Sequence, residues 1–419
     1  MRKHISVVFA LLAAACASAG PQDAPAQAEL AIVGARVYPS PGAAPLMDAT
    51  VIVRDGVIEK VGPASVVHAS PSAEVIDGRG LTVVAGLWNS HVHLFSPTLS
   101  QMTPRSAEAT AGELEAMLTH WGFTTVFDIS SLPGAAIELG KRIDAGEIPG
   151  PNILTVDAPI FPVNGTPIYV RDLLAGQPSF EVGDPAAATQ RVGAQIAAGA
   201  DGVKLFTGAI VGPPIGVLPM RLDIAKAASA EAHRLGKPVF AHPSNRAGLD
   251  VAIEGGADIL AHTTADDGQA WTPELVARLR EHNMALIPTL TLWDVELRRN
   301  KAPEAIIKSF IAVAQGQLKT YADAGGEILF GTDVGYTDAF DTTEEYRLMS
   351  EAGLNFDQIL GSLTTAPSAR FGFPRKGSVA AGMDGDLTVL TVDPAADITG
   401  FAKVAYTIRA GKVIYTAKQ

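Results

Sequence analysis

Eight short apolar runs, separated by Ala-rich stretches of helical character, divide the chain between about Leu81 and Phe373. This alternation is typical of repeated strand and helix units. Eight parallel strands with intervening helices close naturally into a barrel, because strand tilt and stagger then match. The runs are Thr82-Val83-Val84 leading to His91, Thr124-Thr125-Val126-Phe127, Ile153-Leu154-Thr155-Val156, Val203-Lys204-Leu205-Phe206, Val239-Phe240-Ala241-His242, Ile259-Leu260-Ala261-His262, Ala285-Leu286-Ile287-Pro288 and Ile328-Leu329-Phe330-Gly331.

An open doubly wound sheet is the structural alternative to a barrel. It would require a Gly-rich phosphate loop after an early strand, and no G-x-G-x-x-G or Walker-type sequence follows any of the eight runs. We therefore predict an α/β chain with a (β/α)8 TIM barrel over residues 81–373.

Short β-rich runs lie on both sides of this region. Residues 29–80 contain Asp55-Gly56 as a hairpin turn signal, and residues 374–419 contain Ala410-Gly411-Lys412 as a turn into a last β-rich run. We expect the two chain ends to form one small β-sandwich domain, with the barrel inserted between its halves.

The first 19 residues have the layout of a bacterial secretory signal, with a basic start, an apolar stretch over residues 5–15 and then small residues. Cleavage after Ala17-Ser18-Ala19 and cleavage before Cys16, as in a lipoprotein signal, are both open, and a buried N-terminal helix is a third alternative. Residues 20–28 are short of apolar anchors and are interpreted as a linker. We expect an exported protein, either periplasmic or anchored to the outer membrane by a lipid on Cys16.

The composition excludes several classes of site and partner. Cys16 is the only cysteine, so the mature domain can hold no internal disulfide and no cysteine-ligated metal. The formal net charge is −12 and no run of Lys or Arg forms a basic stripe, so the electrostatic footprint of a nucleic-acid-binding protein is absent. We expect a small-molecule substrate as the partner, and a homo-oligomer is compatible with the sequence.

Four of the nine histidines follow predicted strands. In Asn89-Ser90-His91-Val92-His93 the two imidazoles are two residues apart, so in an extended segment both can reach one metal ion. The pair alone is weak evidence, since two ordinary strand histidines would give the same pattern. His242 and His262, however, also stand at the carboxyl ends of strands, where barrel enzymes place their catalytic groups.

Lys204 lies inside an otherwise apolar run, and a buried ammonium without a partner is costly. Three explanations are open: the side chain reaches solvent, it pairs with an acid, or its amine has reacted with CO2 to form a carbamate that bridges two divalent metals. Asp333 follows the last predicted strand and completes the set of candidate ligands, although it could instead cap the next helix.

The segment Val84-Ala85-Gly86-Leu87-Trp88-Asn89-Ser90-His91-Val92-His93 resembles the first-strand motif of the amidohydrolase superfamily. The resemblance covers nearly the whole mature chain, including Asp77-Gly78-Arg79-Gly80, Thr364-Thr365-Ala366-Pro367-Ser368-Ala369-Arg370 and Gly377 to Leu387, and it is strongest to the imidazolonepropionase-like and Xaa-Pro dipeptidase-like branch. True imidazolonepropionases lack such a bridging lysine, so Lys204 favours a two-metal member.

The resemblance implies two zinc-type ions and their ligands. His91, His93 and Asp333 would bind one ion, His242 and His262 the other, and carboxylated Lys204 would bridge them. Ligation by nitrogen and oxygen suits Zn²⁺, while Mn²⁺, Co²⁺ or Fe²⁺ could occupy the same site.

The implied reaction is cleavage of an amide C–N bond by a metal-bridging hydroxide, with Asp333 as the catalytic base. An N-acyl amino acid or dipeptide-like substrate with a hydrophobic portion is expected. A lactone or phosphotriester hydrolase on the same metal centre is an open alternative, and a non-enzymatic metal-binding lipoprotein is a remote one.

The loops after the predicted strands are long and apolar, and they are expected to line the substrate pocket. Phe161, Tyr169 and Trp293 are the candidate substrate contacts, although the same side chains could merely cover the barrel rim. Arg246 is a candidate clamp for a substrate carboxylate, although it could simply begin a helix.

Overall fold

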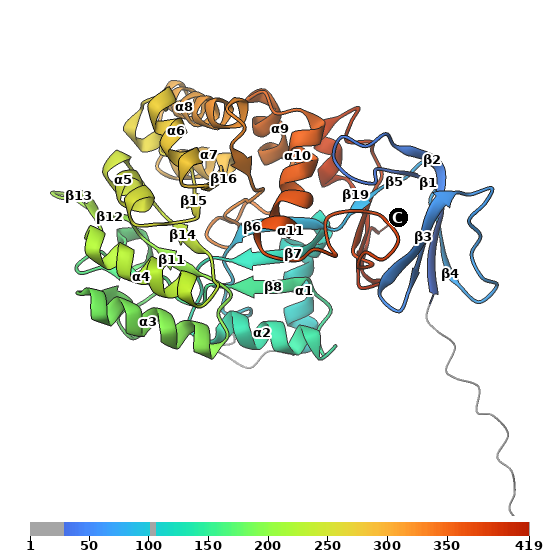
Figure 1. Cartoon of the computed structure of the whole chain (residues 1–419), viewed down its shortest axis with the longest axis horizontal. Coiled ribbons are helices and arrows are strands. Elements are labelled where there is room, and N and C mark those ends of the chain that lie inside the picture. Colours follow the sequence, from blue (N-terminus) through green and yellow to red (C-terminus); the bar gives the residue numbers. More distant parts are fainter. Residues whose placement is uncertain (1–28, 101–105, 419) are drawn as a thin grey trace, which may run out of the picture.

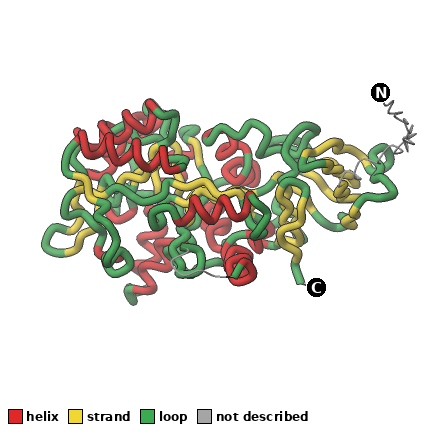
Figure 2. The backbone as a smooth tube through the Cα atoms, turned by 90° about the horizontal axis from the view of Figure 1, so that it is seen from below, coloured by secondary structure: helices red, strands yellow, loops and turns green. Residues whose placement is uncertain are grey.

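The computed structural model of the chain describes residues 29–100 and 106–418. The expected export signal, Cys16 and the linker lie outside these described residues. Figure 1 shows a helix-rich part and, beside it, a sheet to which both ends of the described chain contribute. Figure 2 shows the same division along the long axis, with most helices at one end and strands without helices at the other.

The sheet at one end has eight strands in the order β20-β19-β18-β5-β1-β2-β3, with β4 paired to β1. Most neighbours are antiparallel, but β1 runs parallel to β4 and β5. The hydrogen bonds join the described strands of this region into one sheet, and not into the two separate sheets of a sandwich. The strands are β1 (Glu29–Val37), β2 (Leu46–Arg54), β3 (Val57–Pro63), β4 (Glu74–Asp77), β5 (Thr82–Ala85), β18 (Leu387–Leu390), β19 (Val404–Arg409) and β20 (Lys412–Thr416).

The parallel strands form a three-stranded sheet, β6-β7-β8, and a five-stranded sheet, β11-β14-β15-β16-β17. Only isolated bridges, Val92 with Val334 and Ile160 with Leu205, connect the two, so the described strands form no continuous closed ladder. A closed (β/α)8 barrel therefore stays a prediction. The strands are β6 (Leu87–Val92), β7 (Phe123–Asp128), β8 (Asn152–Thr155), β11 (Val203–Leu205), β14 (Val239–Ala241), β15 (Ile259–Ala261), β16 (Ala285–Ile287) and β17 (Glu327–Ile328).

Helices follow most of these strands and lie on the outside of the parallel sheets (Figure 1). They begin and end at ordinary signals: in α3, for example, the side chain of Asp184 accepts the N–H of Ala187, and Gly199 ends the helix in the left-handed region. The α-helices are α1 (Ala107–Met117), α2 (Ala135–Asp144), α3 (Pro185–Ala198), α4 (Leu222–Arg234), α5 (Arg246–Glu254), α6 (Pro273–Glu281), α7 (Leu290–Arg299), α8 (Glu304–Asp323), α9 (Thr343–Glu351), α10 (Phe356–Leu363) and α11 (Thr365–Arg370).

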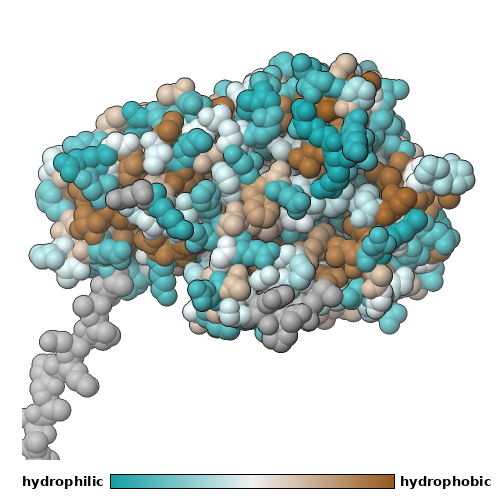
Figure 3. All heavy atoms as spheres, turned by 180° about the vertical axis from the view of Figure 1, so that it is seen from behind, coloured by the Kyte–Doolittle hydropathy of each residue, from teal (hydrophilic) through white to brown (hydrophobic). Residues whose placement is uncertain are grey.

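Shorter elements complete the chain. Among the described helices, none is long and apolar enough to cross a membrane. On the face shown in Figure 3, hydrophobic side chains lie in small groups among hydrophilic ones. The short elements are the strand pairs β9 (Phe161–Pro162) with β10 (Glu181–Val182) and β12 (Gly208–Gly212) with β13 (Gly216–Pro219), and the 3₁₀ helices η1 (Thr119–Trp121), η2 (Ile168–Val170), η3 (Ala265–Asp267) and η4 (Ile398–Ala402).

One predicted strand of the barrel is wrong. Residues 82–84 belong to β5, which pairs with β18 in the mixed sheet, and β6 is the strand that leads to His91. The chain changes sheet at Gly86, where a Cβ atom would lie 2.2 Å from Oγ1 of Thr124. Only glycine fits this close approach. The apolar run that looked continuous is divided between two sheets, since β5 pairs with β18 and β6 pairs with β7.

Large apolar side chains fill the space between the parallel strands. Trp88, Phe127 and Phe240 are buried there, and Phe371 from the end of α11 packs against all three, with ring centroids 5.9, 4.9 and 6.0 Å apart. Because this end is closed by packed rings, polar groups at the other end of the strands can face a cavity.

Candidate metal centre and active-site cavity

Six buried polar side chains lie at the carboxyl ends of five parallel strands or in the segments that directly follow them. The other residues of these strands are mostly apolar and buried, so the point at which each strand leaves the core and becomes a loop is fixed. The exposed fraction of each of these residues is 9% or less, so all six side chains are largely shielded from water. They are His91 and His93 at the end of β6, Lys204 in β11, His242 after β14, His262 after β15 and Asp333 after β17.

Asp333 is held beside the two histidines of β6 by backbone hydrogen bonds. Its N–H donates to the carbonyl of His91 (2.9 Å), and the N–H of His93 donates to the carbonyl of Val334 (2.8 Å). Asp333 Oδ1 lies 3.1 Å from Nε2 of His91 and 2.8 Å from Nε2 of His93, and Oδ2 lies 3.8 Å from Nε2 of His262. Potential ligand atoms of His91, His93 and Asp333 all lie within 4.8 Å of one another.

Hydrogen bonds from the outer ring nitrogens orient two of the imidazoles. His93 Nδ1 lies 2.8 Å from the carbonyl oxygen of Ser130, which can only accept, so Nδ1 carries the proton. His262 Nδ1 lies 2.6 Å from Oγ1 of Thr289, and this hydroxyl donates to the carbonyl of Pro288 (2.8 Å). In both rings the Nε2 lone pair is therefore free to face the cluster, as in metal-binding histidines.

The other two side chains complete the cluster through ring contacts. The His242 ring stacks on Phe206 with centroids 4.6 Å apart and lies 4.8 Å from the His262 ring. Nζ of Lys204 lies 5.7 Å from the centre of the Phe206 ring. Among the residues that the structure describes, none forms a hydrogen bond or ion pair with this amine.

Burial controls the charges of the cluster. It lowers the pKa of His91 to about 3 and the pKa values of His242 and His262 well below the usual range, so these imidazoles are neutral at neutral pH. Burial also lowers the pKa of Lys204 to about 7, against the opposing charge of Asp333. For Asp333, burial acts to raise the pKa, but His91 and His93 outweigh it and hold this pKa well below its usual range.

This donor set fits divalent metal ions. Asp333 Oδ1 and His91 Nδ1 are buried and have no hydrogen bond of normal geometry, although nitrogen atoms crowd Oδ1. Neutral imidazoles and a carboxylate, without a thiolate, are the ligands that Zn²⁺ and related ions take. The geometry brings His91, His93 and Asp333 within ligand distance of one another, and it places Lys204, His242 and His262 at the wall of the same cavity.

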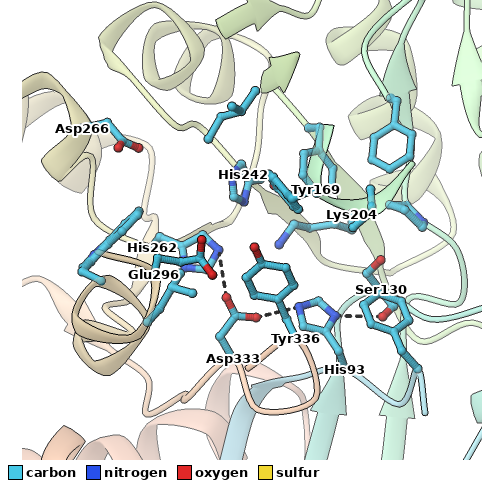
Figure 4. Close-up of a pocket in the computed structure, with 18 of the residues that line it drawn as sticks. His93, Ser130, Tyr169, Lys204, His242, His262, Asp266, Glu296, Asp333 and Tyr336 are labelled. Carbon is cyan, nitrogen blue, oxygen red and sulfur yellow. Dashed lines mark hydrogen bonds and ion pairs between the residues drawn. The ribbon is translucent and has the colours of Figure 1, made fainter. Parts of the chain in front are cut away.

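The cluster opens into a cavity of about 300 Å³. Its wall is largely apolar and aromatic, and Figure 4 shows the polar side chains that point into it. Phe161, Tyr169 and Trp293, the predicted substrate contacts, all line this cavity. Arg246 does not: it is exposed, and its Nε pairs with Asp250 at 3.2 Å.

Sequence reasoning missed several residues that line the cavity. Glu296 and Leu297 in α7, and Asn300 at its end, lie three, four and seven residues after the predicted contact Trp293, which is the period of one helix face. That signal was present in the sequence. Asp266 in η3 and Tyr336 in the loop after Asp333 also line the cavity, and no local pattern marks them.

Known proteins resemble this chain in sequence and in fold. Ochratoxinase from Aspergillus niger is 25% identical over 419 residues, an alignment that covers 88% of this chain and 83% of ochratoxinase. The structure of a Xaa-Pro dipeptidase with bound methionine has a TM-score of 0.77 at 21% identity, covering 93% of this chain and 100% of that chain. The A. niger ochratoxinase structure has a TM-score of 0.76 at 20% identity, covering 93% and 96%.

The sequence model of the amidohydrolase family matches residues 82–414, which is well over half of the chain. The resemblance seen in the first-strand motif is thereby confirmed, as is the expectation of an enzyme. This chain belongs to the amidohydrolase family and is a hydrolase.

Proposed function

We propose that this enzyme hydrolyses an amide C–N bond in a small substrate with a bulky hydrophobic portion. The observation that carries the proposal is the apolar cavity that opens directly onto the buried histidine, lysine and aspartate cluster. The family supports it, as does the likeness to a Xaa-Pro dipeptidase, an enzyme named for cleaving a peptide bond.

Two divalent cations, with zinc as our choice, would be held by the six side chains of the cluster. We assign His91, His93 and Asp333 to one ion and His242 and His262 to the other. Lys204 would bridge them as a carbamate, formed when its neutral amine adds CO2 and releases a proton. The low pKa of Lys204 supports this reaction, because much of the amine is then uncharged near neutral pH.

The bound cations would supply Lewis acidity toward water and toward the scissile carbonyl. Asp333, ionised at neutral pH, accepts the proton of the attacking water and returns it to the departing amine nitrogen. Water first adds to the carbonyl carbon, and the C–N bond then breaks as the C=O bond re-forms, which gives a carboxylate and an amine. His93 and His262 keep fixed orientations throughout, because Ser130 and Thr289 hold their outer nitrogens.

The cavity wall favours large apolar groups. Phe161, Phe206 and Trp293 surround the space in front of the cluster, and burying an aromatic substrate group against them is favourable by about 25 cal/mol for each Å² removed from water. Two carboxylates, Asp266 and Glu296, also line the wall. Because most of the wall is apolar, we propose N-acyl amino acids and dipeptide-like amides whose apolar side chain occupies the cavity.

The test is a hydrolysis panel with metal-replete protein. It includes N-benzoyl and N-acetyl amino acids with large and small side chains, dipeptides, one aryl lactone and one phosphotriester. Amide hydrolysis with kcat/KM rising from Ala to Phe side chains is expected. Turnover confined to the lactone or the phosphotriester would contradict the proposed amide specificity, and release of the amine by a chelator-treated sample would contradict the metal requirement.

We also propose that the protein is exported, on the pattern of its first 19 residues and the lipid-attachment alternative at Cys16. Cell fractionation of a tagged full-length chain tests this. A product in the periplasm or outer membrane, shortened at its N-terminus, is expected, and a full-length cytoplasmic product would contradict export. Palmitate labelling that disappears in Cys16→Ala separates a lipoprotein from a freely released protein.

A further inference from the structure

The loop from Asp333 to Thr337 closes on itself directly after the last metal-ligand candidate. The N–H of Thr337 donates to the carbonyl of Asp333, and the N–H of Gly335 donates to the carbonyl of Thr337, both at 3.1 Å. Gly335 has φ +96° and lies so close to β6 that a Cβ atom would be 1.8 Å from the carbonyl oxygen of His93. Tyr336 is therefore carried by a loop that is fixed to both Asp333 and His93.

The Tyr336 ring is held on two sides. The ring of Tyr169 meets it at 61° with centroids 5.3 Å apart, and the guanidinium of Arg299 lies 5.7 Å from its centre. Arg299 in turn pairs with Glu296 at 2.6 Å. Figure 4 shows the Tyr336 hydroxyl pointing into the middle of the cavity, toward the space between Lys204, His242 and His262.

This hydroxyl stays a neutral donor. Burial, together with the charges of Glu296 and Asp333 and a hydrogen bond to the Glu296 carboxylate, raises the pKa of Tyr336 above its usual range, so the O–H is intact at any pH at which the enzyme would work. Two other donors on the wall already have partners: Trp293 Nε1 donates to Thr263 Oγ1 (3.1 Å), and Asn300 Nδ2 donates to the carbonyl of Glu296 (2.8 Å).

We propose that Tyr336 is a catalytic residue that donates a hydrogen bond from its phenol O–H to the oxygen of the scissile carbonyl. This inference rests on the proposed amide hydrolysis. When water adds to the carbonyl carbon, the C=O π electrons move onto oxygen, and a donor already aimed at that oxygen stabilises the negative charge without reorganisation. The two-sided packing of the ring serves this role, because it fixes the direction of the O–H.

The test variant is Tyr336→Phe, which keeps the ring and removes only the donor. We expect kcat to fall by about 10²–10³-fold, as for removal of one oxyanion donor, with KM, metal content and melting temperature little changed. Tyr406→Phe, in β19 of the mixed sheet, is the matched control and should behave as the parent. A Tyr336→Phe enzyme with kcat within three-fold of the parent would overturn the proposal, as would a loss of rate seen only in Tyr169→Phe.

A binding measurement separates this inference from the proposed function. Benzylphosphonate has tetrahedral oxygens like the reacting carbonyl in its transition state, whereas phenylacetate is planar; both carry the same aromatic group. In Tyr336→Phe, calorimetry should show weaker benzylphosphonate binding and unchanged phenylacetate binding, and equal effects on the two ligands would overturn the proposal. If the parent cleaves lactones but no amide, the proposed function fails, yet the same comparison of rates on the lactone still tests Tyr336.

Discussion

Glu345 provides a pH-dependent contribution to stability whose sign can be worked out from the structure. The residue lies in α9 and is 1% exposed. Its carboxylate accepts the N–H groups of Leu290 (2.9 Å) and Thr291 (2.7 Å), the first residues of α7. These bonds satisfy two backbone donors at the start of the helix that carries Trp293 into the cavity wall. Burial nevertheless raises the pKa of Glu345 from 4.5 to about 7.

Because the pKa of Glu345 is raised in the folded state, the contribution of this residue to the free energy of unfolding falls as the pH rises. Between pH 4.5 and about 7 the folded chain keeps a proton on Glu345 that the unfolded chain has lost, so the free energy of unfolding falls with pH in this window. The gap between the two pKa values corresponds to about 3 kcal/mol, at 1.36 kcal/mol for each pH unit. The contribution is fully present below pH 4.5 and is lost once the pH exceeds the folded pKa.

Denaturant unfolding of the parent and of Glu345→Gln, at half-unit steps from pH 4.5 to 8, measures this contribution. Gln cannot titrate, and every other pH-dependent term, metal binding included, cancels in the difference between the two proteins. We expect the stability of the parent relative to the variant to decline by about 3 kcal/mol across the range. A difference that is constant with pH, or one that grows in favour of the parent as the pH rises, would refute the reasoning.

Three further substitutions test the cluster. Lys204→Ala should lose most of the bound metal and activity, with partial recovery on adding a short carboxylate and metal; elemental analysis showing two metals together with a normal rate would contradict the bridge. Asp333→Asn keeps the shape of the side chain but accepts no proton at neutral pH, so kcat should fall by about 10²–10⁴-fold while substrate affinity is retained, and a kcat within a few-fold of the parent, with both metals bound, would assign proton transfer to another group. Gly335→Ala should lower the free energy of unfolding by at least about 1 kcal/mol and reduce metal content, because its Cβ would meet the carbonyl oxygen of His93; unchanged melting and metal content would show that the loop accommodates the methyl group.

The sequence predicted the buried cluster because each of its members interrupts or follows an apolar strand. Lys204 inside Val203-Lys204-Leu205 and the histidines after β14 and β15 contrast with their neighbours, and parallel strands bring such positions to one edge. Period and polarity are local properties, so a single sequence contains them. The assignment of individual ligands to individual metal ions remains a prediction.

The features of the fold and the site that the sequence did not predict depend on contacts between distant segments. The division of residues 82–92 between β5 and β6 follows their pairing with different strands, β18 and β7, which no pattern within the run shows. Tyr336 reaches the cavity because a backbone turn closes on Asp333, and Arg246 misses it because its helix points the guanidinium to Asp250 in solvent. An arginine after a strand end has the same sequence pattern in either case.

The pairing of β5 with β18 joins residues that are about 300 positions apart in the chain. Closing a loop of that length costs more conformational entropy than forming a local helix or strand unit. Contacts of this kind therefore form late and slow folding. During synthesis, Val83 and Val84 leave the ribosome long before Thr388 and Val389, which pair with them. Until then one edge of the growing sheet has unpaired N–H and C=O groups beside apolar side chains, a surface that a chaperone or a second nascent chain can bind.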